Sequence, residues 1–329
     1  MAKIELPTDL RTGLKQQLEA FSAKELAQCV ADLSHRYRTN LPIDGQRIVQ
    51  SPKDAAAYAA FRLPATYGGV YAALRQVRAQ FPQWQPQTLL DVGAGPGTVM
   101  WSATHPDLWP ETLHKITLLE REANMITLGR RLAGYASLAS IREARWHAVD
   151  ITERWGTTPH DLVVTSYVLG ELPRNSRAAF IDQLWEMTKH TLVIIEPGTP
   201  IGFGHIREAR DQLRTMGGKV VAPCPHDRPC PMEGADWCHF RHRVTRSRLH
   251  RQTKAGELGY EDEKFCFVAM SRAQSRGIQS RVIRHPQVRK GHIRLQLCTP
   301  TGLVGTVVTR KDRELFRQAR NLEWGSSFH

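Results

Sequence analysis

Short apolar runs, separated by longer amphipathic stretches, dominate the middle of the chain. Each run is rich in aliphatic or β-branched residues and ends in a polar residue. This pattern is typical of strands buried on both faces of a parallel sheet, joined by helices. It predicts an α/β core with strands at 88–91, 115–120, 146–150, 161–166 and 192–196.

The N-terminal part instead repeats its apolar residues at helical spacing, as expected for amphipathic helices. Two stretches have this spacing, 10–38 and 52–80. Ser22 and Glu25 form a capping-box pattern that opens a second helix within the first stretch. The second stretch is expected to break near Pro64 and again near Gly68 and Gly69.

Beyond the core the pattern predicts a helix over 206–216, followed by a proline-rich loop. Strands near 265–270 and 292–297 are then expected to complete the main sheet. A last strand over 304–310 and a short helix over 312–320 close the chain.

The first predicted strand leads into Asp91-Val-Gly-Ala-Gly-Pro-Gly97, with glycines at alternate positions. Glycine serves where a chain turns sharply and a ligand must approach the backbone. Glu120 ends the second predicted strand, 29 residues after Asp91, where doubly wound nucleotide-binding folds carry a ribose-binding acid. A plain strand-to-helix turn and a solvated strand-end charge are the structural alternatives.

This first motif, an acid followed by Gly93, Gly95 and Gly97, resembles that of class I S-adenosylmethionine-dependent methyltransferases. The resemblance implies that the glycine turn holds the methionine end of the cofactor, Glu120 the ribose and Asp150 the adenine amine. Members acting on base amines often carry Asn/Asp-Pro-Pro-aromatic after the fourth strand, but this chain has Tyr167-Val-Leu-Gly-Glu171. No catalytic base or nucleophile is identified, and methyl transfer remains open.

Composition is that of an ordinary globular protein, with 41% hydrophobic and 23% charged residues. No apolar run approaches a membrane span, and no targeting segment is visible near the start, so a bacterial-type cytoplasmic location is expected. The net charge of +13 is uneven, because residues 201–329 hold 24 Lys/Arg against 12 Asp/Glu. Such a basic region is the electrostatic signature of a polyanion binder.

Three of the six cysteines, Cys224, Cys230 and Cys238, fall in the proline-rich loop. Clustered thiols in a cytosolic chain more often bind metal than form disulfides. Their spacing fits no zinc-finger template, and Pro after two of them is reminiscent of iron–sulfur ligand runs. A fourth ligand is required, and Cys298 at a strand end is favoured over Cys266, His226 and His239, with a Cys3His zinc site as the rival.

Residues 239–251, immediately after the cysteines, contain five arginines, three histidines and no acid. Arginine suits bidentate phosphate recognition and base stacking. This stretch therefore predicts a surface that faces RNA or DNA. Its arginines are Arg241, Arg243, Arg246, Arg248 and Arg251.

Taken together, these stretches resemble the methyltransferase-like family of small-ribosomal-subunit assembly factors, known from mitochondria with bacterial relatives. The most distinctive are Cys224-Pro-His-Asp-x-x-Cys230-Pro, Trp237-Cys-His-Phe240 and Leu297-Cys-Thr-Pro-x-Gly302. The family implies S-adenosylmethionine as ligand, binding to small-subunit ribosomal RNA, and a [4Fe–4S] cluster. Its four cysteine ligands match Cys224, Cys230, Cys238 and Cys298 of this chain.

The leading hypothesis is an S-adenosylmethionine-binding, [4Fe–4S]-containing factor that binds rRNA and assists small-subunit assembly, and hence translation. Its cluster would be structural, because four cysteines leave no open iron. An active rRNA methyltransferase and a zinc-stabilised nucleic-acid-binding module with a vestigial cofactor pocket are the alternatives. The expected parts are a helical cap (1–85), a Rossmann-like cofactor core (86–218), a cysteine and basic insertion (219–262), and C-terminal strands with a basic tail (263–329).

Overall fold

The computed structural model describes residues 4–39, 49–245 and 260–328. Its central feature is a mixed, mainly parallel sheet with the strand order β3-β2-β1-β4-β5-β8-β6, in which β7 also pairs with β8. The predicted α/β class with a Rossmann-like sheet is therefore confirmed. The strands of this sheet are β1 (Thr88–Val92), β2 (Lys115–Glu120), β3 (Arg145–Ala148), β4 (His160–Ser166), β5 (Thr188–Pro197), β6 (Lys219–Ala222), β7 (Phe240–Thr245) and β8 (Tyr260–Ser271).

The sheet order reverses beside β1, which pairs in parallel with β2 on one side and β4 on the other. In such sheets a crevice opens beyond the carboxyl ends of the strands at the reversal, and ligands bind there. Val92 at the end of β1 lies opposite Leu119 of β2 and Thr165 of β4. The end of β1 is thus the place where the fold positions a site.

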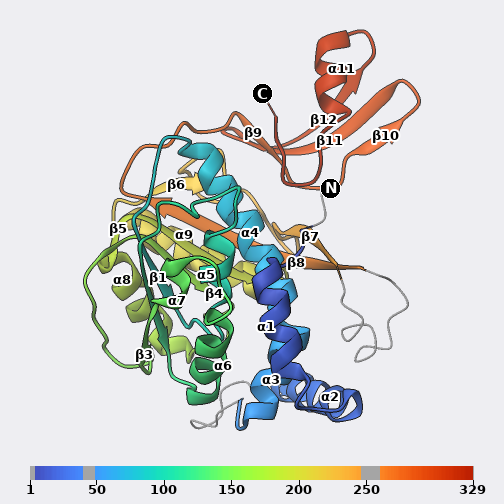
Figure 1. Cartoon of the computed structure of the whole chain (residues 1–329). Coiled ribbons are helices and arrows are strands. Elements are labelled where there is room, and N and C mark those ends of the chain that lie inside the picture. The colour runs from blue at the N-terminus through green and yellow to red at the C-terminus, as the bar shows by residue number, and fades with distance from the viewer. Residues whose placement is uncertain (1–3, 40–48, 246–259, 329) are drawn as a thin grey trace.

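Helices cover both faces of this sheet (Figure 1). One core joins α1 and α4 to the strands, and the other joins α8 and α9 to the opposite face. None of the helices in the described part of the chain combines the length and apolar character needed to cross a bilayer. The helices are α1 (Thr8–Leu18), α2 (Ala23–Thr39), α3 (Pro52–Phe61), α4 (Leu63–Gln80), α5 (Thr98–Ala103), α6 (Ala123–Ala133), α7 (Ala139–Arg142), the 3-10 turn η1 (Arg174–Ser176), α8 (Arg177–Glu186), α9 (Pro200–Thr215) and α11 (Arg313–Ala319).

The N-terminal helices follow the sequence prediction except at one break. The capping box is confirmed, since the Ser22 backbone N–H donates to Glu25 Oε2 at 3.0 Å and the Glu25 N–H donates to Ser22 Oγ at 3.3 Å. The expected break near Gly68 and Gly69 is wrong, because both residues lie inside α4. A Cβ on Gly68 would stand 2.6 Å from Val244 Cγ2 of β7. This glycine serves close packing rather than a turn.

The C-terminal strands also correct the prediction, because only β8 joins the main sheet. The strand expected at 292–297 belongs instead to a second, five-stranded sheet. Residues 219–222, expected to begin the cysteine and basic insertion, form β6 and pair with β8. The second sheet has its own small core and stands at the opposite end of the molecule from α2 and α3 (Figure 1). Its strands are β9 (Ser280–Val282), β10 (Gln287–Arg289), β11 (His292–Thr299), β12 (Gly302–Thr309) and β13 (Ser327–Phe328).

Candidate cofactor and cysteine sites

The glycine turn after β1 has the backbone that its sequence requires. Gly93, Gly95 and Gly97 have φ angles of +73°, +54° and +84°, a region that residues with a Cβ rarely adopt. A Cβ on Gly93 would also lie 2.4 Å from Val168 Cγ2. Gly97 is the N-cap of α5. The turn therefore depends on glycine both for its conformation and for its contact with the segment after β4.

Glu120, at the end of β2, holds this turn by a hydrogen bond. Its carboxylate accepts hydrogen bonds from the backbone N–H of Gly95 at 2.7 Å and from that of Glu122 at 2.8 Å. Burial raises the pKa of Glu120, and the two backbone hydrogen bonds oppose that rise. The predicted acid and the predicted glycines are thus brought together. Ribose binding by Glu120 stays a prediction.

A cavity of about 110 Å³ opens beside the turn, at the carboxyl ends of the strands. Glu120 lines it together with Gly93 and Gly95, and Tyr167 and Glu171 line it from the segment after β4. The wall also includes Val49, Tyr58, Arg121, Glu122, Met125, Val149, Ile151, Thr152, Ser166, Val168 and Leu172. The arrangement combines backbone N–H groups, carboxylates and apolar side chains in one concave site.

Three of the predicted cofactor residues, Asp91, Gly97 and Asp150, do not line this cavity. Asp150 lies between lining residues, but its carboxylate accepts from the Thr152 N–H at 2.9 Å and approaches Arg121 at 3.8 Å. Asp91 is fully buried, and neither of its carboxylate oxygens has a partner among the described residues. Burial, with the Glu120 carboxylate nearby, raises the pKa of Asp91 well above its ordinary value. A donor that reached Asp91 would relieve this cost.

Tyr167 is held in a polar cluster that the sequence did not reveal. Its backbone has a φ of +62°, and its hydroxyl donates to Glu263 Oε1 at 3.0 Å. Arg62 pairs with the same carboxylate at 3.0 Å and stacks on the Tyr167 ring at 4.5 Å. Burial raises the pKa of Tyr167 well above its ordinary value, so the phenol is neutral. A fixed, neutral phenol is a poor general base.

The four cysteines predicted as ligands line a single cavity of about 30 Å³. Cys224 and Cys230 come from the loop after β6, Cys238 from the segment before β7, and Cys298 from β11 of the second sheet. Cys266 of β8 lines the same cavity, but its thiol donates to the Pro197 carbonyl at 3.2 Å. Segments far apart in sequence thus converge on one thiol-rich site.

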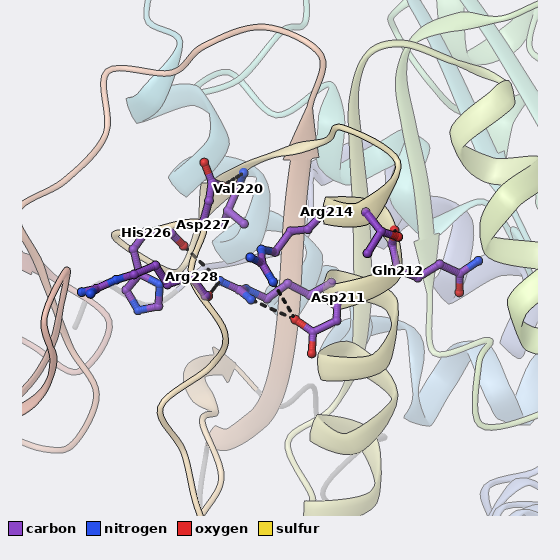
Figure 2. Close-up of polar contacts among 9 residues, drawn as sticks. Asp211, Gln212, Arg214, Val220, His226, Asp227 and Arg228 are labelled. Atoms are coloured by element: carbon purple, nitrogen blue, oxygen red, sulfur yellow. Dashed lines mark hydrogen bonds and ion pairs between the residues drawn. The ribbon is translucent and has the colours of Figure 1, made fainter.

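Arg210 of α9 organises the loop that carries two of these cysteines. Its guanidinium is buried and donates to the carbonyls of His226 at 3.0 Å and Arg228 at 2.6 Å. The Asp227 carboxylate accepts from the Val220 N–H at 2.7 Å. Figure 2 shows His226, Asp227 and Arg228 on the loop facing Asp211 and Arg214 of α9. The loop is therefore fixed by hydrogen bonds even though it lacks regular secondary structure.

The thiols are buried close enough to affect one another. Burial, followed by the neighbouring thiols, raises the pKa of Cys298 to about 12 and that of Cys238 well above its ordinary value. His226 Nε2 lies 3.7 Å from Cys298 Sγ. The described residues contain no group of three or more His, Cys, Asp or Glu arranged to hold a metal ion. The predicted metal site thus stays a prediction, although all four of its residues meet at one cavity.

The predicted RNA-binding arginines are only partly described. Arg241 and Arg243 lie on β7, whereas Arg246, Arg248 and Arg251 fall outside the described residues. Arg243 binds Asp262 of β8 through two hydrogen bonds of 2.7 and 2.9 Å, and Arg241 reaches the same carboxylate at 3.3 Å. The register of β7 against β8 places Arg243 opposite Asp262. Asp262 thus neutralises part of the positive charge of a stretch that contains no acid of its own.

Comparisons with known proteins agree with the family suggested by the motifs. The family model described as mitochondrial small ribosomal subunit Rsm22 matches residues 52–329. The chain is 32% identical over 290 residues to the ribosome assembly protein METTL17, mitochondrial, of Homo sapiens, covering 82% of this chain and 61% of that protein. It is 21% identical to the ribosome assembly protein RSM22, mitochondrial, of Saccharomyces cerevisiae, covering 79% and 64%. The chain thus spans less than two thirds of these relatives.

Solved structures with a similar arrangement include methyltransferases. Magnesium protoporphyrin IX methyltransferase from Synechocystis, with bound S-adenosylmethionine, is 12% identical with a TM-score of 0.42, over 73% of this chain and 91% of that one. A putative RNA methyltransferase from Pyrococcus horikoshii is 11% identical with a TM-score of 0.39, over 74% and 95%.

The expected bacterial-type cytoplasmic location is wrong. The matching family and the human and yeast relatives are all described as mitochondrial. The expectation rested on the absence of a visible targeting segment near the start of the chain. Such an absence is not a positive signal for any compartment.

Proposed function

Because the chain belongs to the family of the mitochondrial small ribosomal subunit protein Rsm22, we propose that it assists assembly of the small ribosomal subunit, and hence translation. In this proposal the chain binds ribosomal RNA, holds S-adenosylmethionine beside the glycine turn and carries a [4Fe–4S] cluster on four cysteines. The observation that carries the proposal is the convergence of Cys224, Cys230, Cys238 and Cys298 on one cavity.

The cofactor proposal is supported by the chemistry around the glycine turn. The sulfonium and ammonium groups of S-adenosylmethionine are cationic, and the adjoining cavity is lined by the carboxylates of Glu120, Glu122 and Glu171. Asp91 adds a buried carboxylate without a partner among the described residues. In this proposal Gly93 and Gly95 admit the cofactor's methionine end, and Glu120 and Asp150 contact its ribose and adenine.

The cluster proposal is supported by the placement of charge around the cysteines. Buried, mutually repelling thiolates require a cation. Two arginines, Arg210 and Arg281, are buried near them, at 2% and 4% exposure. A cubane with four thiolates carries two net negative charges, which two guanidinium groups offset. When bound, such a cluster would tie the loop after β6 to the second sheet through Cys298.

A single zinc ion is the rival occupant of this cavity. Zinc draws four ligands to one point, with Zn–S distances of about 2.3 Å. A cubane binds each thiolate at a separate corner, so its ligands stand further apart.

The RNA-binding proposal is supported by exposed cations on the second sheet and its helix. Their positive charge adds to that of β7, and phosphate contacts of this kind dominate nucleic-acid affinity. The exposed members are Arg289, Lys290, Arg294, Arg310, Lys311, Arg313, Arg317 and Arg320.

Metal analysis of protein purified without oxygen tests the proposal. We expect about four irons and four sulfides per chain and a brown absorbance. Cys298→Ser should lose this iron, whereas the matched control Cys266→Ser, in the same cavity, should keep it. A colourless protein with one zinc, or equal iron loss in both variants, would contradict the cluster.

An active rRNA methyltransferase is the second candidate, because Tyr167 and Glu171 line the cofactor cavity where a substrate would enter. It predicts transfer of a labelled methyl group to small-subunit RNA that stops in Gly95→Val. The fixed contacts of Tyr167 with Arg62 and Glu263 favour the non-catalytic role. Absence of transfer by an S-adenosylmethionine-loaded protein would eliminate this second candidate.

A further inference from the structure

A polar cleft of about 280 Å³ lies between α4, β7 and the segment 323–327. It shares no lining residue with the cavity beside the glycine turn. Its walls consist of Tyr71, Ala72, Arg75, Gln76, Ala79, Gln80, Phe240, Arg241, His242, Phe265, Arg281, Glu323, Trp324, Gly325, Ser326 and Ser327. It meets the cysteine cavity at Phe240, and Arg281, placed above near the thiols, also lines it.

Five buried polar atoms on these walls have no hydrogen-bond partner within the described part of the chain. They are Gln76 Oε1, Gln80 Oε1, Arg241 Nε, His242 Nε2 and Trp324 Nε1. Buried polar side-chain atoms normally have partners, and each unsatisfied one costs about 1–3 kcal/mol. Five such atoms around one cleft point to a ligand that supplies both donors and acceptors.

The charged and aromatic side chains that line the cleft indicate the chemical class of that ligand. Arg75, Arg241 and Arg281 line it with one lining acid, Glu323. Arg241 also pairs with Asp262, and Arg281 donates to the carbonyls of Pro223 and Gly325, so Arg75 is the cation that most favours an anionic group. Its walls also present aromatic rings, among them Tyr71 and Trp324. Buried His242 has its pKa lowered to about 4, by desolvation and then by Arg75, and is therefore a neutral hydrogen-bonding ring at neutral pH.

We propose that this cleft binds one nucleotide of single-stranded RNA, with its base among Gln76, Gln80 and Trp324 and its phosphate near Arg75 and Arg241. A nucleobase supplies donors and acceptors on its edge and a flat surface for aromatic contact, and its phosphate supplies the anion. This inference deepens the proposed RNA binding and rests on it. The cleft would read one unstacked base, while the exposed cations bind the backbone.

Two probes test the cleft. The first is a 12-nucleotide single-stranded RNA with one central 2-aminopurine, whose fluorescence falls on stacking, and the second is adenosine 5′-monophosphate measured by calorimetry. We expect binding of both to the wild-type chain. Trp324→Phe, which keeps a ring but removes the N–H, and Gln80→Leu should each weaken the mononucleotide about three- to tenfold, as expected for one lost hydrogen bond.

Arg241→Gln and Arg289→Gln form a matched pair for the RNA. Both remove one cation, but Arg289 lies exposed on β10, away from the cleft walls. Arg241→Gln should weaken mononucleotide and RNA alike, whereas Arg289→Gln should affect only RNA and its salt dependence. Thermal unfolding and circular dichroism of each variant check that the fold is kept.

The outcomes separate this inference from the proposed function. RNA binding that is unchanged in Trp324→Phe and Gln80→Leu, with no change in 2-aminopurine fluorescence, would overturn the cleft and leave RNA binding intact. Failure of the wild-type chain to bind any RNA would contradict the proposed function. Failure to bind adenosine 5′-monophosphate as well would then overturn the cleft independently.

Discussion

Replacing Asp91 by Asn should make the cofactor-free protein more stable and its cofactor binding weaker. Asp91 has no exposed surface, both oxygens lack partners among the described residues, and the Glu120 carboxylate lies nearby. An unsatisfied buried polar group costs about 1–3 kcal/mol, and more when it is charged. Removing the charge while keeping the shape should therefore raise the free energy of unfolding at pH 7 by about that amount.

The pH dependence gives this prediction its sign. Because the folded-state pKa of Asp91 is raised, the folded protein binds its proton more tightly than the unfolded chain. The carboxylate therefore destabilises the wild type above the unfolded-state pKa, and this penalty disappears as the pH falls below it. The stability advantage of Asp91→Asn should accordingly be largest near neutral pH and shrink in acid.

Urea unfolding at several pH values, with calorimetric titration of S-adenosylmethionine, measures both effects. A charge-assisted hydrogen bond contributes about 1.5–3 kcal/mol, so the variant should bind the cofactor about 10- to 100-fold more weakly. Asp161→Asn is the control, because that carboxylate accepts from the N–H groups of Gln87 and Thr88 at 2.9 and 3.0 Å and its loss should destabilise. Lower stability of Asp91→Asn at pH 7 would refute the reasoning.

Two further predictions concern β7. Gly68→Ala should destabilise the fold by about 1–3 kcal/mol, because the added Cβ would lie 2.6 Å from Val244. The control Gly204→Ala, in a helix with no atom within 4 Å of the added Cβ, should stabilise it by about 0.5–1 kcal/mol. Equal shifts of the unfolding temperature in the two variants would contradict the packing role of Gly68. Asp262→Asn should remove the ion pair of Arg243, so that RNA binds more tightly and with a steeper salt dependence. Fluorescence anisotropy of labelled RNA measures both. Weaker binding would show instead that the ion pair positions the arginine.

The core strands and the glycine turn could be predicted because their signals are local. A run buried on both faces carries its own pattern, and an alternating glycine motif specifies its own backbone conformation. The place of each C-terminal strand could not be predicted in this way. The strand at 292–297 has the alternation of a strand with one buried face, which fits either sheet equally well. In the structure β6 occupies the place beside β8 in the main sheet, and the strand at 292–297 belongs to the second sheet.

The polar partners within the sites were missed for the same reason. Arg62 and Glu263 are 201 residues apart, and no periodicity links them to Tyr167. Asp262 lies in a segment of mixed charge, so its pairing with Arg243 follows only from the β7–β8 register. The cysteines were accessible because their clustering is visible in sequence, whereas Arg210 in a charged helix gives no comparable signal.

Strand β8 connects all of the proposed sites. Its Glu263 side chain holds Tyr167 at the cofactor cavity, Phe265 lines the polar cleft and Cys266 lines the cysteine cavity. Successive side chains point to opposite faces of the sheet, so neighbouring β8 residues serve different sites. A ligand that binds only the folded state stabilises it by mass action. Because the sites share this strand, S-adenosylmethionine at saturating concentration should slow loss of the cluster to a chelator. An unchanged rate would show that the two sites open independently.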